Sequence, residues 1–275
     1  MKQNHLDRCN IDFWNELCGS VVARSLGITN NTPENLARFD EAYLAFYPYL
    51  KKYLDAGSLR GKRVLEIGLG YGSLGQLLVQ TGCEYYGVDI AENSAALMQQ
   101  RLKTVGKDPM HVQIGSALDV CYRDETFDYV YSIGCLHHAG ELSRAVAEVH
   151  RVLKPSGKAI VMLYNRHAFR RWFMIPMKYC CLRVHNWFSG RRSVAFSEYD
   201  RAFYDATVGG EAAPHTDFVS KRDVKDLFRG FSSLQLECQN FDSISVMGLT
   251  VIPRQRLLNN IGRIAGLDLY VVATK

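Results

Sequence analysis

The chain has 275 residues, enough for one large α/β domain with additions or for two small domains, and we expect one domain. Its formal net charge of +5 is only mildly basic, which excludes nucleic acid as an expected partner unless the basic residues form a patch. The eight cysteines form no C-x-x-C pair and no His/Cys ligand spacing, so we expect neither a metal site nor a disulfide framework.

No stretch of the sequence has the composition of a membrane-spanning helix, since nowhere do about 18 apolar residues run uninterrupted. The first ten residues are polar and lack the apolar core of a signal peptide. Scattered cysteines without pairing are typical of a reducing compartment. These features predict a soluble protein of the cytoplasm.

Helical patterns of apolar and aromatic side chains occupy residues 11–60. Thr32 followed by Pro33 is typical of a helix start, because threonine caps free N–H groups and proline fits the first turn. The aromatic pattern that follows continues to Tyr47. We expect residues 1–60 to form a helical cap, whose aromatic side chains either pack onto a sheet or wall a substrate pocket.

The core is organised around residues 64–72, which read VLEIGLGYG. An aliphatic run gives way to alternating glycines, and the apolar helical pattern at residues 74–79 completes a predicted strand, turn and helix. Glycines allow positive φ and close approach of a ligand, and a helix N-terminus presents free N–H groups. The segment predicts a nucleoside-cofactor site. Gly70, Gly72 and Gly75 also match the dinucleotide spacing G-x-G-x-x-G, so these residues alone leave the cofactor open.

A second predicted strand, Glu84–Ile90, contains Asp89 and is followed by an amphipathic helix over residues 92–105. Asp89 lies 21 residues after Gly68, near the separation at which an acidic side chain meets a ribose diol. Adjacent parallel strands bring their carboxyl ends to one edge, where a carboxylate can accept both hydroxyl hydrogens. Asp89 is therefore a candidate cofactor ligand, and the alternative is a turn or capping residue.

Strands and helices continue to alternate along the rest of the chain. The predicted strands are residues 111–114, 127–133, 158–164, 234–241 and 267–273, and a helix is predicted at 142–153. This alternation predicts parallel pairing with right-handed crossovers. Ligands bind beyond the carboxyl ends of the strands in such sheets. We therefore expect the glycine-rich turn, Asp89, Ser116 and the segment 132–138 to converge.

Five segments form a specific combination: VLEIGLGYG at 64–72, GVD at 87–89, FDYVYS at 127–132, LHH at 136–138 and RVLKPSG at 151–157. Through them the chain resembles class I S-adenosylmethionine-dependent methyltransferases of the small-molecule type. The resemblance implies a Rossmann-like α/β fold, with a doubly wound, mostly parallel seven-stranded sheet whose last strand is antiparallel. It also implies an N-terminal helical cap and an insertion after the fifth strand.

The resemblance implies S-adenosylmethionine as the cofactor, and Glu66 is the residue that separates it from a dinucleotide. Family members place a carboxylate there that helps to hold the methionine ammonium group, often through water, whereas a carboxylate facing a pyrophosphate is unfavourable. The alternative for Glu66 is an exposed acid at a strand end. Ser116 stands where relatives often carry an Asp that contacts the adenine amino group, and its hydroxyl or the Ala117 backbone would replace that contact.

The cofactor-binding residues that follow from the turn, from Asp89 and from the resemblance are Glu66, Gly68, Leu69, Gly70, Gly72, Asp89, Ile90, Ser116, Ala117, Ser132, Ile133 and Gly134. Methyl transfer from a sulfonium is an in-line displacement that largely needs a positioned acceptor. A hydroxyl acceptor also needs a base, and histidine titrates near neutral pH. His137, His138 and His215 are the catalytic candidates, and the alternative for each is that it shapes the pocket or binds cofactor.

Basic and aromatic side chains interleave in residues 166–192. This pattern is typical of a lid over the pocket, of a helix that contacts a membrane surface peripherally, and of an oligomer contact such as a homodimer. The sequence does not choose among the three. We expect one methyltransferase domain over residues 1–275, divided into a cap at 1–60, a cofactor-binding core at 61–165, a lid or substrate insertion at 166–218, and a C-terminal helix and strands at 219–275.

The expected reaction is methyl transfer to a small-molecule acceptor, such as a natural product, quinone or lipid-like intermediate, at oxygen. Two other functions compete with it. A nicotinamide-dependent oxidoreductase would use the same glycines but would carry a second substrate domain. A non-catalytic binding protein with the methyltransferase fold would have a broken cofactor pocket, whereas Glu66, the glycines and Asp89 are all present.

Overall fold

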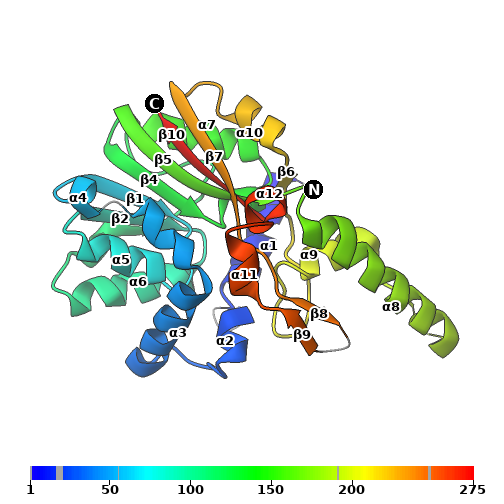
Figure 1. Ribbon diagram of the computed structural model, residues 1–275. Coiled ribbons are helices and arrows are strands. Elements are labelled where there is room, and N and C mark those ends of the chain that lie inside the picture. The colour runs from blue at the N-terminus through cyan, green and yellow to red at the C-terminus, as the bar shows by residue number, and fades with distance from the viewer. Residues whose placement is uncertain (1, 17–20, 55, 191, 247–248) are drawn as a thin grey trace.

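The structure is a computed structural model that describes residues 2–16, 21–54, 56–190, 192–246 and 249–275. Cys18 and Arg191, which belong to the cysteine set and to the basic insertion, lie outside the described residues. Figure 1 shows a central sheet with helices on both faces and one long helix, α8 (Ile175–Ser189), that extends away from the rest.

The central sheet has the strand order β3-β2-β1-β4-β5-β10-β7. Its strands are β1 (Arg63–Ile67), β2 (Glu84–Asp89), β3 (Val112–Ile114), β4 (Phe127–Ile133), β5 (Leu153–Asn165), β7 (Ser233–Gln239) and β10 (Asp268–Thr274). Strands β1 to β5 pair in parallel, and β10 runs antiparallel to both β5 and β7. The expected fold class is therefore confirmed. A two-residue strand, β6 (Phe218–Val219), pairs with β5 and adds an eighth strand.

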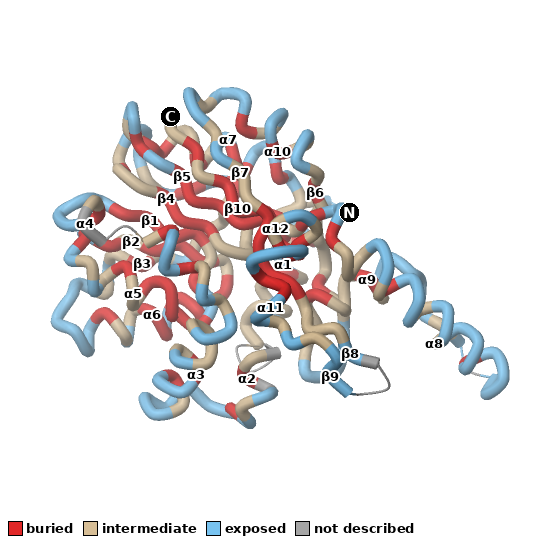
Figure 2. The backbone as a smooth tube through the Cα atoms, in the orientation of Figure 1, coloured by how far each residue is buried: buried red, intermediate tan, exposed pale blue. Residues whose placement is uncertain are grey.

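Two hydrophobic clusters cover the two faces of the sheet. Side chains of β1 alternate between them, so Leu65 and Ile67 join the cluster under α7 (Leu142–Val152) and α10 (Lys221–Leu227). Val64 joins the cluster under α5 (Ser73–Gln80) and α6 (Glu92–Thr104). Figure 2 shows this pattern as buried residues along the central strands and exposed residues on the outer helices.

The N-terminal helices α1 (Gln3–Trp14), α2 (Val21–Ser25), α3 (Pro33–Phe46) and α4 (Ala56–Leu59), with the 3-10 helix Pro48–Tyr53, precede the first strand. Residues 3–10 are helical, although the predicted helical region began at residue 11. The predicted cap of α3 is present, because the Thr32 side chain accepts a hydrogen bond from the Asn35 N–H. Phe39 of α3 stacks on Tyr71 of the glycine-rich turn with ring centroids 4.0 Å apart, so the cap packs directly on that turn.

An ion pair fastens the N-terminal helices to the core. Both guanidinium Nη atoms of Arg101, on α6, donate to the carboxylate of Asp40, on α3, at 2.8 and 2.9 Å. The side chains are only 9% and 18% exposed, so water screens the pair weakly.

Two stretches differ from the predicted elements. The strand predicted at residues 158–164 begins earlier, because β5 starts at Leu153 and continues through a bulge at which its pairing with β4 shifts register and Ser156 has a φ of +63°. No helix was predicted within the last part of the insertion at residues 166–218, where the structure has α9 (Phe196–Ala202).

The C-terminal third adds elements that the periodicity did not reveal. A hairpin of β8 (Ile244–Val246) and β9 (Leu249–Ile252) and the short helices α11 (Arg254–Leu258) and α12 (Gly262–Ala265) lie between β7 and β10. Earlier in the chain, after β5, a π-helical turn, Arg170–Met174, leads into α8. Among the described helices, none combines the length and apolarity needed to cross a bilayer.

Replacing Arg101 by leucine should lower the free energy of unfolding by about 3 kcal/mol, because the substitution leaves the weakly exposed Asp40 carboxylate without its cation. Urea denaturation measures this. Arg63→Leu is the matched control, because Arg63 pairs with Glu84 on the exposed surface and its loss should change stability little. Equal effects of the two substitutions would contradict the anchoring role of Arg101.

Candidate functional site

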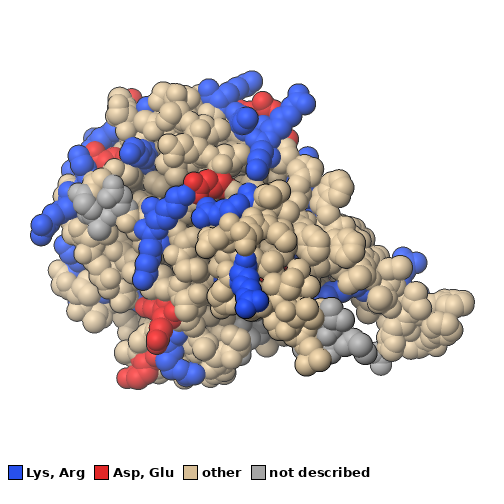
Figure 3. Space-filling model, in the orientation of Figure 1, with Lys and Arg blue, Asp and Glu red and all other residues tan. Residues whose placement is uncertain are grey.

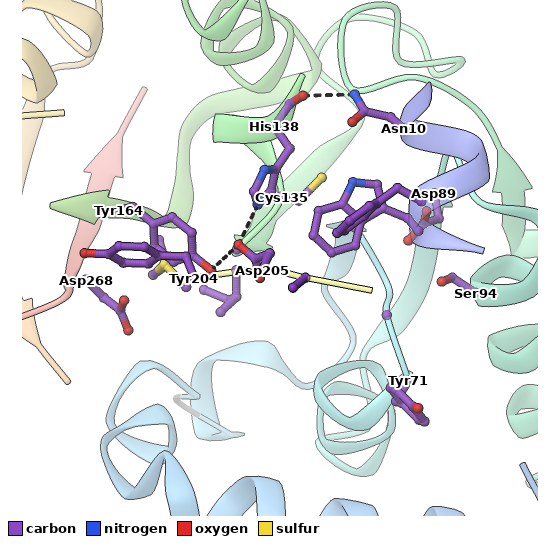
Figure 4. A pocket seen from close by; sticks show the side chains of 18 of the residues that line it. Asn10, Tyr71, Asp89, Ser94, Cys135, His138, Tyr164, Tyr204, Asp205 and Asp268 are labelled. Atoms are coloured by element: carbon purple, nitrogen blue, oxygen red, sulfur yellow. Dashed lines mark hydrogen bonds and ion pairs between the residues drawn. The ribbon is translucent and has the colours of Figure 1, made fainter. Parts of the chain in front are cut away.

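A cavity of about 580 Å³ lies at the edge of the sheet where the parallel strands end. Its walls come from the turns after β1, β2, β3 and β4, from α1 and α3, and from the segment after α9 (Figure 4). The start of β10 also reaches the cavity, because an antiparallel strand begins at the edge where its parallel neighbours end. The predicted convergence of segments at this edge is therefore present in the structure.

The turn after β1 needs glycine for two separate reasons. Gly68 has a φ of +85°, and a Cβ there would lie 2.3 Å from the Cβ of Cys135, so glycine lets the turns after β1 and β4 touch. Gly70 has a φ of +50° and lines the cavity, and a Cβ there would meet nothing within 4 Å. The main chain at Gly70 is thus open to a ligand.

Asp89 connects that turn to the end of β2. Its two carboxylate oxygens accept hydrogen bonds from the Leu69 N–H at 2.6 Å and from the Ala91 N–H at 2.8 Å. Burial raises the pKa of Asp89, and the backbone N–H groups oppose the shift. Because each carboxylate oxygen offers about two acceptor positions, the side chain has capacity left on the cavity wall that it helps to form.

The predicted site residues divide between the cavity wall and the layer behind it. Those that line the cavity are Gly68, Gly70, Asp89, Ile90, Ser116, Ala117, Ile133, Gly134 and His138. Three of the others act from behind the wall. Leu69 gives its N–H to Asp89, the Ser132 hydroxyl donates to the Ile67 carbonyl at 2.9 Å, and Gly72 makes room for Met98 and Arg101 of α6.

Glu66 lies beneath the glycine-rich turn instead of on the cavity wall. It is 1% exposed, which excludes the alternative of an exposed strand-end acid. The Tyr85 hydroxyl donates to its Oε2 at 2.6 Å, and burial raises the pKa of Glu66 to about 8. A Cβ on Gly75 would lie 2.7 Å from both Glu66 Oε2 and the Tyr85 oxygen, so the third glycine of the motif accommodates this pair. Its contact with the cofactor ammonium stays a prediction.

His138 is the predicted histidine that reaches the cavity. Its Nδ1 lies 2.7 Å from the His215 carbonyl oxygen, which can only accept, so Nδ1 carries the proton. Its Nε2 faces the Asp205 Oδ2 at 3.5 Å, and that same oxygen accepts a hydrogen bond from the Tyr164 hydroxyl at 3.0 Å (Figure 4). Burial lowers the pKa of His138, and the nearby Asp205 carboxylate opposes the shift.

The other two predicted histidines lie behind the wall. His137 is fully buried between the rings of His138 and Tyr164, and burial lowers its pKa. The His215 side chain pairs with Asp217 at 3.1 Å, and His215 reaches His138 through its backbone carbonyl. The geometry therefore favours His138 as the group closest to a bound acceptor.

Several residues of the cavity were missed by the sequence interpretation. Asp205, Tyr164 and Asp268 line it, and burial raises the pKa of Asp268 to about 7. Tyr164 and Asp268 had a usable signal, because one ends a parallel strand and the other begins the antiparallel strand at the same edge. Asp205 follows α9 and is brought to the cavity by tertiary packing alone, so no local pattern marked it.

Arg170 is a further missed residue of the cavity. Its guanidinium donates to the Asp242 carboxylate, with Nε 2.6 Å from Oδ2, so this cation and carboxylate neutralise each other on the wall. Across the described residues, no group of three or more histidine, cysteine or acidic side chains has the arrangement of a metal site.

The residues on the wall fit a nucleoside cofactor. The buried carboxylate of Asp89 can accept hydrogen bonds from ribose hydroxyls. At Gly70 the main chain is open to a ligand. Ser116 contributes a hydroxyl group to the wall, and Ala117 contributes backbone polar groups. A cavity of about 580 Å³ is within the usual range for small-molecule sites and has room for an acceptor as well.

Comparison with known proteins adds a family match. Residues 65–161 match the family described as a methyltransferase domain. The chain is 31% identical over 110 residues to the ubiquinone biosynthesis O-methyltransferase of Pseudomonas entomophila, and 29% identical over 107 residues to phosphoethanolamine N-methyltransferase 2 of Caenorhabditis elegans. These matches cover 40% and 38% of this chain, and 47% and 24% of the relatives. The chain thus spans less than half the length of either relative.

Solved structures show the same fold at low sequence identity. The YcgJ protein of Bacillus subtilis matches with a TM-score of 0.54 at 17% identity, over 83% of this chain and 98% of that one. A SAM-dependent methyltransferase of Methanosarcina mazei matches with a TM-score of 0.52 at 17% identity, over 83% and 97% of the two chains. These likenesses concern the fold.

The buried Glu66 should make stability depend on pH. Its pKa of about 8 in the folded state lies above the ordinary value of 4.5, so the folded chain keeps a proton that the unfolded chain releases. The stabilisation that this proton provides is fully present below pH 4.5 and is lost as pH rises through 8. Between pH 4.5 and pH 8, the free energy of unfolding of Glu66→Gln should therefore rise relative to that of wild type by up to about 1.4 kcal/mol per pH unit.

Urea denaturation of both proteins between pH 5 and pH 8 measures this difference. Glu84→Gln is the control, because Glu84 is exposed and its pKa is lowered, mainly by the Tyr86 hydroxyl, so Glu84 is ionised in the folded and the unfolded chain across this window and its loss should leave the pH dependence unchanged. If the stability curves of wild type and Glu66→Gln stay parallel across the window, Glu66 does not titrate as described.

Proposed function

We propose that this chain, which contains a class I S-adenosylmethionine-dependent methyltransferase domain, is an enzyme that methylates a small-molecule acceptor at oxygen. S-adenosylmethionine is the cofactor of this domain class and supplies a methyl group activated on a sulfonium sulfur. The observation that carries the proposal is the His138, Asp205 and Tyr164 cluster on the wall of the cavity, next to the nucleoside-type residues.

The cofactor half of the cavity is assigned to the turns after β1, β2 and β3. In this proposal Asp89 receives the ribose hydroxyls, and Ser116 with Ala117 lies against the base. Gly70 gives access to the main chain beside them. An ammonium group held near Glu66 through water would favour the ionised carboxylate and lower the raised pKa that burial gives Glu66 in the free chain.

His138 has the protonation state that a base requires. The His215 carbonyl holds the proton on Nδ1, which leaves a lone pair on Nε2, and burial lowers the pKa so that the ring is neutral near pH 7. When Nε2 takes the hydroxyl proton of the acceptor, the Asp205 carboxylate stabilises the imidazolium that forms. Tyr164 orients that carboxylate by donating to it.

The acceptor half of the cavity favours an aromatic or otherwise partly apolar molecule. Tyr43, Phe46, Tyr47, Met162, Phe203 and Tyr204 line it. Aromatic walls bury apolar area and stack on rings, which suits a phenolic ring that carries the hydroxyl. The similarity to a ubiquinone biosynthesis O-methyltransferase supports an acceptor of this kind, a quinone precursor or related natural product.

Isothermal titration calorimetry tests the cofactor. S-adenosylmethionine and S-adenosylhomocysteine should bind, and NADH should not. Asp89→Asn should weaken binding by roughly tenfold or more, because an amide loses the charge-assisted hydrogen bonds to the ribose while its oxygen still accepts a backbone N–H. Asp226→Ala, an exposed acid on α10, is the control. Binding of NADH in place of the sulfur cofactors would support the oxidoreductase instead.

Transfer of labelled methyl groups to a panel of phenols, catechols and amines tests the reaction. His138→Ala should lower kcat by roughly 10²- to 10⁴-fold, as expected for loss of a general base, and should leave cofactor affinity nearly unchanged. His215→Ala is the matched control, because only its backbone carbonyl contacts His138. Asp205→Asn should lower kcat. It should also move the acidic limb of the pH profile to lower pH, because the Asp205 carboxylate raises the pKa of His138 and its loss lets that pKa fall further.

Two outcomes would contradict the proposed reaction. Methylation of amines with no methylation of any hydroxyl compound would exclude an oxygen acceptor. Cofactor binding without transfer to any compound of the panel, or to any component of an extract of the source cells followed by mass spectrometry, would favour a non-catalytic binding protein.

A further inference from the structure

The α8 arm, defined here as residues 172–188, carries six of the large apolar side chains that are exposed among the described residues. Trp187 and Phe188 near its tip are 77% and 78% exposed, and Trp172, Phe173, Met177 and Val184 are also exposed. In Figure 1 the arm extends away from the sheet and its covering helices. Folded chains rarely expose aromatic side chains in such number without a partner.

These side chains form a stripe and are not scattered. Phe173, Met177, Val184 and Trp187 are separated by four, seven and three residues, which are helical repeats, and Phe188 lies beside the last of them. Phe173 lies in the π-helical turn, Arg170–Met174, that precedes α8. The arm therefore presents a continuous apolar face to solvent.

The opposite face of the arm is already occupied. Tyr179 packs on the rings of Phe196 and Tyr199 of α9, with centroids 5.1 and 5.2 Å away, and Ile175 is fully buried. The Tyr179 hydroxyl donates to the Val194 carbonyl at 2.8 Å. Because these contacts fix the inner face on the body, the stripe stays on the outer side, where no described segment buries it.

The charge around the stripe has one sign. Residues 166–197 contain no aspartate or glutamate, and Arg183, on the same helix as the stripe, is exposed. The hairpin at the base of the arm has the same character, since residues 243–267 also lack acidic side chains and Leu249 and Val251 are exposed. Phe169, Ile244 and Ile252 all pack against the buried cluster of Phe241, Leu257 and Leu258, which connects the base of the arm with the hairpin. In Figure 3 the arm shows uncharged and basic side chains only.

We propose that the α8 arm docks on the surface of an anionic lipid bilayer, with its apolar stripe in the interface and its basic side chains against the headgroups. An aromatic face flanked by Lys and Arg, on a helix that does not span a bilayer, is the arrangement of an interfacial helix. A second copy of this chain explains the arm less well, because two arms with the same basic charge and no carboxylate would repel each other.

The arm is also connected to the cavity. Met174 and Lys178, at its base, line the cavity wall. Docking would bring that wall close to the bilayer and give a lipid-soluble acceptor a short path to the site. This consequence rests on the proposed function, whereas docking itself does not.

Co-sedimentation of the full chain with vesicles tests the proposal. Vesicles of phosphatidylcholine with about one quarter phosphatidylglycerol should bind the chain, phosphatidylcholine alone should bind it more weakly, and high salt should reduce the difference. The double substitution Trp187→Ala with Phe188→Ala should weaken binding to the anionic vesicles about tenfold or more. Both side chains are exposed, so unchanged thermal unfolding confirms that the variant is folded.

The matched control is Val105→Ala with Met110→Ala, two exposed apolar residues outside the arm and the hairpin, which should bind like wild type. Arg183→Glu should weaken binding to anionic vesicles and leave binding to phosphatidylcholine nearly unchanged. No binding to anionic vesicles, equal binding by the double variant, or a dimer in light scattering that dissociates in the double variant would overturn the proposal. None of these results depends on methyl transfer.

Discussion

The carboxylate of Asp89 is the contact on which the site depends. It accepts the Leu69 N–H and the Ala91 N–H, and so holds the turn after β1 against the end of β2. The turn after β1 also needs glycine at position 68, because the Cβ of any other residue would collide with the side chain of Cys135, which follows β4. Three strand ends are thus fixed relative to one another before any ligand binds, and the cavity is the space they leave at one edge of the sheet.

The fold was predictable because its signals are local and repeated. Alternating strand and helix patterns, the positive φ of the glycines and the cap at Thr32 all act within a few residues of sequence. The parallel order then followed from the crossover rule. The same logic placed Asp89, Ser116 and His138 at one edge. It failed at β5, where a bulge carries the strand through Ser156 instead of ending it.

The rest of the site was less predictable because it depends on contacts between distant segments. Glu66 has the sequence position of a ligand, but the pleat of β1 turns it toward Tyr85 and away from the cavity. His138 differs from His137 and His215 because it lies on the cavity wall, where the His215 carbonyl and Asp205 contact its two ring nitrogens. Residues 166–192 allowed three interpretations, and the exposed apolar face of α8 is the observation on which the proposed membrane contact rests.

One cavity is thus proposed to hold both partners of a methyl transfer, the cofactor against Asp89 and the acceptor against the aromatic wall beside His138. The most direct test is a crystal structure of the chain with S-adenosylhomocysteine. We expect density for the ligand in this cavity, with its ribose hydroxyls on the Asp89 carboxylate and with His138 and Asp205 left free for an acceptor. Density at another surface, or a ligand that fills the space beside His138, would contradict the account.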